Sequence, residues 1–76
     1  MQVLTNDGDI FTGTAKEIVT QLREAGRLDL DQTNPEFMAH VAARAHLWNA
    51  AHIRTLAPEK FLYDLAEADF LVIMDE

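Results

Sequence analysis

Cysteine and serine are both absent from this chain of 76 residues. Without cysteine, the chain can form no disulfide and supplies no thiolate metal ligand or cysteine nucleophile. Without serine, it has no serine nucleophile and no Gly-x-Ser-x-Gly elbow of the hydrolase type. Only 3 glycines are present, and none stands in a phosphate-binding loop motif. A chain this short can also scarcely enclose a catalytic pocket. We therefore expect no enzyme activity and no cofactor.

Long hydrophobic runs and a basic leader segment are also missing. No apolar stretch approaches the roughly 20 residues that a membrane span needs. No basic region followed by an apolar core marks a signal peptide at the N-terminus. We expect a cytoplasmic protein without membrane contacts. Its length predicts one domain, residues 1–76, with a modest core, because a chain of this size buries only roughly 60% of the surface exposed when unfolded.

Basic residues are scarce, with 6 Lys and Arg against 13 Asp and Glu, for a formal net charge of −7. Affinity for phosphate backbones depends on clustered Lys and Arg, so the composition argues against a nucleic acid partner. A protein partner or self-association fits the composition better. A basic protein surface would complement the acidic chain.

The N-terminal segment predicts a β-hairpin. Residues 1–5 and 10–14 are rich in β-branched and apolar side chains, and an Asp-Gly pair lies between them. A two-residue turn would pair Leu4 with Phe11. A three-residue loop with a bulge would shift the register and bring Val3 towards Phe11. The sequence leaves both registers open.

A first helix begins directly after the hairpin. Thr14 and Glu17 have the spacing of a capping box, in which each residue bonds the backbone N–H of the other. Helical spacing continues at four apolar positions, which are Ile18, Val19, Leu22 and Ala25. Gly26 is placed to end the helix in a left-handed conformation. Leu28 and Leu30 in the following connector are expected to pin it to the core.

The longest helical pattern runs from residue 34 to residue 49. Its start fits two registers: Asn34 caps with Pro35 at the first helical position, or Thr33 caps and Glu36 completes a capping box. At about 100° per residue, one side gathers an apolar face for the core. This face consists of Phe37, Met38, Val41, Ala45 and Trp48.

The same helix carries a second apolar strip, formed by Ala39, Ala43 and Leu47, beside a polar stripe that contains Glu36 and His40. A helix with two apolar strips usually lies between two neighbours, so we expect another helix to pack on Ala39 and Ala43. The alternative is an exposed groove or dimer contact. In that case, these five residues form the candidate partner surface.

The C-terminal third predicts a helix and a strand. Pro58 suits the first position of a third helix, although Ala57 before it is a poor cap, and Ile53 in the preceding connector should point inward. The helix's apolar stripe is Phe61, Leu62, Leu65 and Ala68, and its acidic residues, including Asp64, should face solvent. The apolar run 70–74 fits a strand buried on both faces or a central strand flanked by the hairpin.

These elements predict an α+β fold, in which an N-terminal β-hairpin and three α-helices are followed by a C-terminal strand that joins the hairpin's sheet. The three histidines, His40, His46 and His52, do not predict a metal site. Steps of six residues turn a helix by roughly 240°, so the rings would diverge, whereas helical zinc sites use convergent pairs three or four residues apart. We expect His40 and His46 on the surface and His52 in a loop.

The chain resembles a recurring pattern in small uncharacterised bacterial and phage proteins. The resemblance rests on the hairpin and Gly-Thr-x-x-Glu-Ile-Val element (residues 7–19), the helix start at residues 35–44, and residues 58–65. It departs from the pattern at Asp69, where glycine is expected after the last helix. The resemblance implies a family linked to mobile elements, and it carries no catalytic residue.

The leading hypothesis is a non-enzymatic accessory or regulatory protein that acts through protein–protein contacts. One alternative is a phage-type inhibitor, anti-CRISPR-like or a nucleic-acid mimic, whose acidic surface occupies a nucleic-acid-binding host protein. The other is a small ligand- or metal-binding domain.

Overall fold

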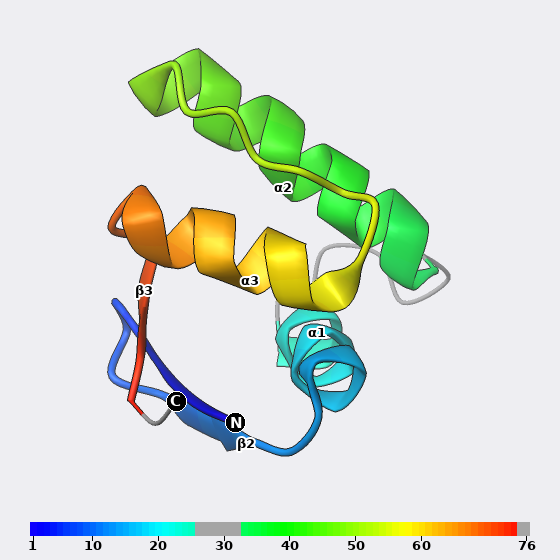
Figure 1. Ribbon diagram of the computed structural model, residues 1–76, viewed down its shortest axis with the longest axis vertical. Coiled ribbons are helices and arrows are strands. Elements are labelled where there is room, and N and C mark those ends of the chain that lie inside the picture. Colours follow the sequence, from blue (N-terminus) through cyan, green and yellow to red (C-terminus); the bar gives the residue numbers. More distant parts are fainter. Residues whose placement is uncertain (26–32, 75–76) are drawn as a thin grey trace.

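The computed structural model describes residues 1–25 and 33–74, and it confirms the predicted α+β class. The elements in chain order are β1 (Gln2–Thr5), β2 (Ile10–Thr12), α1 (Ala15–Ala25), α2 (Asn34–Asn49), α3 (Pro58–Glu67) and β3 (Leu71–Ile73). The three strands form one antiparallel sheet in the order β2-β1-β3. The helices lie on one face of this sheet (Figure 1). α1 and α3 pack next to the strands, and α2 lies beyond them as an outer layer.

The hairpin adopts the register with the three-residue loop. Val3 faces Phe11 across the strands. The Thr5 carbonyl accepts the Gly8 N–H at 3.0 Å, and the Thr5 N–H donates to the Asp9 carbonyl at 2.9 Å. Gly8 has φ +90°, the positive value that the third residue of such a loop requires. Glycine reaches this conformation without a Cβ clash, which explains its place here.

The C-terminal strand differs from both predicted placements. β1 is the central strand, and β3 forms one edge of the sheet. Leu71 points into the core and is buried, whereas Val72 points away from the helices and is 55% exposed. The prediction of a strand buried on both faces was wrong because all the helices cover the same face. The alternative of a central position was wrong because the hairpin lies on only one side of β3.

Two capping boxes fix the starts of α1 and α2. The Thr14 N–H donates to Glu17 Oε1 at 2.9 Å, and the Glu17 N–H donates to Thr14 Oγ1 at 3.1 Å. At α2, the Thr33 N–H donates to Glu36 Oε1 at 2.9 Å, and the Glu36 N–H donates to Thr33 Oγ1 at 3.3 Å. Of the two registers for α2, Thr33 is therefore the cap, and Asn34 is the first helical residue.

Both α2 and α3 end at a left-handed residue that is not glycine. Ala50 has φ 55°, and its N–H donates to the carbonyl of His46. After α3, Asp69 has φ 67° where we expected glycine, so the backbone adopts the expected turn with a different residue. The Phe70 N–H reaches the Leu65 carbonyl at 2.9 Å, as in a Schellman motif. The predictions made for Gly26, Leu28 and Leu30 lie outside the described residues.

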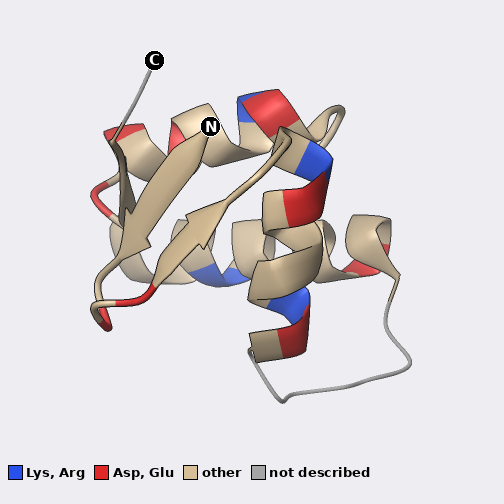
Figure 2. Cartoon of the chain, turned by 90° about the horizontal axis from the view of Figure 1, so that it is seen from below, with Lys and Arg blue, Asp and Glu red and all other residues tan. Residues whose placement is uncertain are grey.

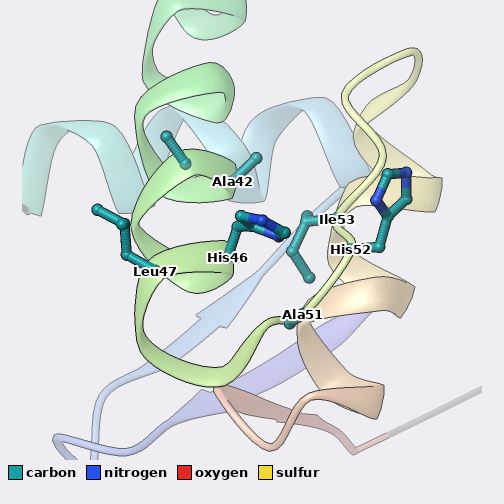
Figure 3. Close-up of a pocket in the computed structure, with 7 residues that line it drawn as sticks. Ala42, His46, Leu47, Ala51, His52 and Ile53 are labelled. Carbon is teal, nitrogen blue, oxygen red and sulfur yellow. The ribbon is translucent and has the colours of Figure 1, made fainter.

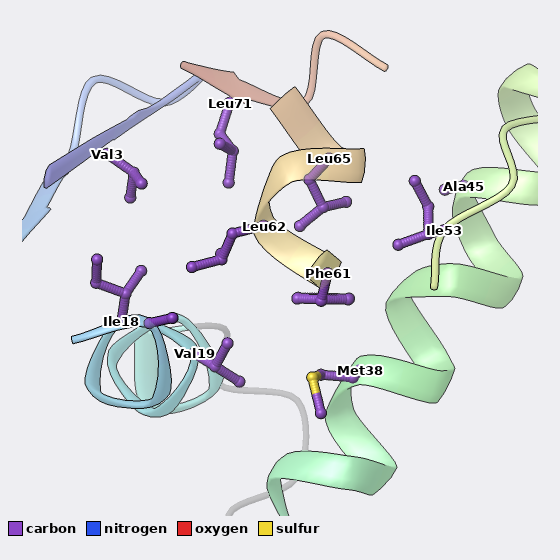
Figure 4. Packing of buried hydrophobic residues seen from close by; sticks show 11 residues of the cluster. Val3, Ile18, Val19, Met38, Ala45, Ile53, Phe61, Leu62, Leu65 and Leu71 are labelled. Carbon is purple, nitrogen blue, oxygen red and sulfur yellow. The ribbon is translucent and has the colours of Figure 1, made fainter. Parts of the chain in front are cut away.

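The hydrophobic core lies between the sheet and the helices, and it continues between α3 and α2 (Figure 4). Its largest fully buried side chains are Phe61, Ile18, Leu62, Val3 and Val19. Phe61 also meets Phe37 of α2 edge to face, with ring centroids 6.4 Å apart. This contact joins the outer layer to the rest of the core.

Trp48 does not belong to this core, and its predicted place on the inner face of α2 was wrong. Its side chain is 71% exposed, whereas Met38 and Ala45 on the same helix are buried. The chain turns back after Ala50, and Ile53 of the connector is buried beside Ala45, as its predicted inward orientation required. Ile53 of the connector, and not Trp48, therefore packs against the inner face of α2 at this end.

Candidate interaction surface

The structure leaves the second apolar strip of α2 uncovered. All five residues of the candidate partner surface, Glu36, Ala39, His40, Ala43 and Leu47, are exposed, and Leu47 is 80% exposed. The prediction that another helix packs on Ala39 and Ala43 was therefore wrong. α1 and α3 both lie on the opposite side of α2, against its inner face, and the strip faces outward.

An open groove of about 560 Å³ borders this strip, between the second half of α2 and the connector (Figure 3). Its lining is Ala42, Ala43, His46, Leu47, Ala51, His52 and Ile53. In Figure 3 the rings of His46 and His52 lie on either side of Ile53, and Leu47 extends from the far side of α2. The groove is therefore apolar at its centre, and a histidine ring lies on each side of that centre.

Charge is divided unevenly between this layer and the rest of the chain. Residues 37–58, which form most of α2 and the connector, contain none of the 13 acidic residues of the sequence. The same segment holds Arg44, Arg54 and all 3 histidines. An acidic protein thus presents one apolar surface with a local positive balance. Coulombic attraction at this surface would favour an acidic group on a partner.

A partly buried ion pair holds the connector against α3. Asp64 accepts the Arg54 Nε–H at 2.9 Å and Nη2–H at 3.0 Å, and its Oδ2 also accepts the Arg54 backbone N–H at 2.8 Å. These hydrogen bonds to Arg54 lower the pKa of Asp64 from 3.8 to about 2, against the opposing effect of burial. They also raise the pKa of Arg54.

Asp64 was predicted to face solvent, and that prediction was wrong, because the residue is only 9% exposed. It stands at the border of the α3 apolar stripe, three residues after Phe61, where a side chain can point either way. Its partner comes from a connector without periodicity. The arginine and aspartate in the two segments were visible in the sequence, but nothing there paired them.

A second polar cluster fixes the start of α2 on α1. Asn34 Oδ1 accepts the Arg23 Nε–H at 2.9 Å, and Asn34 Nδ2 donates to Thr20 Oγ1 at 2.9 Å. The two helices are therefore joined by side chains whose polar atoms are partly buried. This link orients α2 so that its inner face meets α3 and its second strip points outward.

The histidines lie where the sequence placed them, with His40 and His46 on the exposed surface of α2 and His52 in the connector. Across residues 1–25 and 33–74, no three His, Cys, Asp or Glu side chains gather in a way that could hold a metal ion. In those same ranges no helix combines the length and apolar character of a membrane span.

Comparisons with protein family models, curated proteins and solved structures found no significant match to this chain.

Proposed function

We propose that this chain is a non-enzymatic binding protein that holds a partner protein on the exposed strip of α2. The observation that carries the proposal is the uncovered strip of Ala39, Ala43 and Leu47, bordered by an apolar groove. Small side chains let another element approach the helix backbone closely, and Leu47 supplies an apolar anchor. Burying one leucine side chain contributes about 2 kcal/mol of binding free energy.

The partner's chemistry follows from the charge distribution. Arg44, His46 and His52 lie on or beside the strip, and no acidic residue stands between Glu36 and Glu59. A partner with apolar side chains flanked by Asp or Glu would therefore match this surface in both shape and sign. We propose a partner of this kind, which this chain recruits or regulates by binding to it and not by catalysis.

The direct test uses the immobilised chain as bait in a lysate of the organism that encodes it. The wild-type chain should retain one partner in stoichiometric amount, and Leu47→Glu should lose it. The matched control is Leu56→Glu, which alters an 89% exposed leucine that does not line the groove. Circular dichroism establishes that both variants keep the helical fold.

Two comparisons decide the result: binding by Leu47→Glu against binding by the control variant, and binding at low salt against binding at high salt. Retention by Leu56→Glu, with binding that weakens between low and high salt, would support an acidic partner. Equal loss in both variants, or a partner that binds Leu47→Glu normally, would overturn the assignment to the strip.

The phage-type inhibitor is the second candidate, and one observation favours it. Because all 13 acidic residues lie outside residues 37–58, the remaining surface is strongly acidic. A basic nucleic-acid-binding protein would contact that surface instead of the strip. Salt-sensitive binding of such a protein by Leu47→Glu, at wild-type strength, would identify this second function.

A further inference from the structure

β3 forms one edge of the sheet, and β2 forms the other. The Met74 N–H donates to the Gln2 carbonyl at 2.8 Å, which fixes the alternation of the ladder between β3 and β1. In an antiparallel ladder, every second residue directs its N–H and C=O to the same neighbour. The backbone groups of Leu71 and Ile73 therefore point away from β1. Within residues 1–25 and 33–74, no strand pairs with this side of β3.

The opposite edge of the sheet is partly closed. The Thr12 carbonyl on β2 accepts the Nε2–H of Gln21 in α1 at 3.1 Å. This side chain occupies an acceptor that another strand would need. Proteins usually protect a sheet edge with a charge, a proline or a bulge, and Leu71-Val72-Ile73 contains none of these. The two edges thus differ, and β3 is the less obstructed of the two.

The solvent face of the sheet is uncharged. Its side chains are Gln2, Leu4, Ile10, Thr12, Val72 and Met74, which alternate with the inward residues of the three strands. Ile10 is 54% exposed, Val72 55% and Met74 49%. The three strands contain no Lys, Arg, Asp or Glu and are tan throughout in Figure 2. A like-charged molecule therefore meets no side-chain charge on the strands at this face.

We propose that β3 pairs with β3 of a second copy of this chain, antiparallel and about a two-fold axis at Val72. In this register, Leu71 faces Ile73 of the other copy, and both residues carry the backbone groups that point to the edge. All four edge groups of each copy then find partners, and the two Val72 side chains meet on the solvent face. The edge is therefore complementary to itself: the same three residues supply every donor and acceptor on both sides of the pairing, and no second sequence is needed. The result is one continuous six-stranded sheet.

The pairing is weak because the contact is small. A stable dimer buries about 800 Å² of each partner, and two strands of three residues cover much less. We expect a dissociation constant in roughly the millimolar range. Each copy carries a net charge of −7, so added salt should strengthen the association by screening repulsion between the copies. This salt response is opposite to that expected for the partner on α2, and the two proposals stand independently.

The test is sedimentation velocity of the full chain at rising concentration, with Val72→Lys and a matched Ile10→Lys control. Both substitutions place a lysine on the same solvent face, at positions of nearly equal exposure, 55% and 54%. A lysine at Val72 would lie beside its own copy across the two-fold axis, so Val72→Lys should abolish the dimer. Ile10→Lys lies on the other edge strand and should retain it.

Amide hydrogen exchange gives a second readout at single residues. At high protein concentration, protection from exchange should rise by several-fold at Leu71 and Ile73, whose backbone N–H groups point to the free edge. Protection should stay constant at Val72, whose backbone N–H points to β1. A chain that sediments as a monomer at millimolar concentration would overturn the proposal. Equal loss of the dimer in both lysine variants would also overturn it, because stacking of two sheet faces predicts that result.

Discussion

Replacement of Asp64 by asparagine should make the stability of this protein less sensitive to acid. The wild-type carboxylate receives two side-chain hydrogen bonds and one backbone hydrogen bond from Arg54, whereas the amide of Asp64→Asn retains an oxygen acceptor but no charge. The substitution is nearly isosteric, so the core around it should stay packed. The change in free energy of unfolding then reports mainly the ionisation of this one group.

The magnitude follows from the pKa of Asp64, which is 3.8 as a model value and about 2 in the folded protein. One pKa unit corresponds to about 1.4 kcal/mol, and the half-exposed guanidinium of Arg54 is partly screened by water, so we expect about 2 kcal/mol. A carboxyl whose pKa is lower in the folded state than in the unfolded state stabilises the protein. The whole contribution is present at pH values above the pKa of the unfolded state. That contribution is lost as the pH falls from about 4 towards 2.

Urea or thermal unfolding at a series of pH values measures this effect. At pH 7, the free energy of unfolding of Asp64→Asn should be about 2 kcal/mol lower than that of wild type. For a domain of this size, this corresponds to a Tm roughly 8–16 °C lower. Near pH 2 the two proteins should become similar, because the wild-type carboxyl is then about half protonated in the folded state and almost fully protonated in the unfolded state, so little of the contribution remains. The control Glu67→Gln removes an exposed carboxylate of the same helix and should change stability by less than about 0.5 kcal/mol. A difference between wild type and Asp64→Asn that stays constant from pH 7 to pH 2 would refute the reasoning.

Three further predictions concern helix ends and the path of the connector. Ala57 has the extended backbone of a cap but no side-chain hydrogen bond, so Ala57→Ser should raise the free energy of unfolding by about 1 kcal/mol in urea titrations. Ala50→Gly should stabilise the protein by about 0.5–1 kcal/mol in the same assay, because φ 55° strains a residue with a Cβ; a loss of stability would contradict the left-handed cap. Ile53→Ala should cost about 2–4 kcal/mol, whereas Trp48→Ala should lie within about 0.5 kcal/mol of wild type, and the reverse order would place Trp48 in the core.

The local elements of the fold could be predicted from the sequence because their causes are local. Thr14 with Glu17 and Thr33 with Glu36 form capping boxes within four residues, and those contacts do not depend on the rest of the chain. The α+β class then followed from the order of the elements.

The arrangement of these elements around α2 could not be predicted in the same way. Two apolar strips on one helix do not indicate which strip is covered, since that depends on where α1 and α3 dock. Trp48 was assigned to the core by its spacing, but the chain reverses at Ala50 and brings Ile53 to the core instead, while Trp48 stays exposed. The pair of Arg54 and Asp64 was missed for a similar reason, because it joins a helix to a connector that has no repeating pattern. The candidate surface could be named by residue, but only the structure shows that it is exposed.

The pairing of β1 with β3 has a consequence for how the protein forms during synthesis. β1 leaves the ribosome before the three helices, and β3, the strand that covers its second edge, follows all of them. The hairpin can close early, because its strands are joined by a short loop, but the contact between Val3 and Ile73 requires almost the whole chain. Until then, the middle strand of the finished sheet is itself an edge, with backbone groups open to other strands. Contacts this distant in sequence slow folding, so completion of the sheet should be the late step, and the nascent hairpin is the part that a chaperone would have most reason to protect.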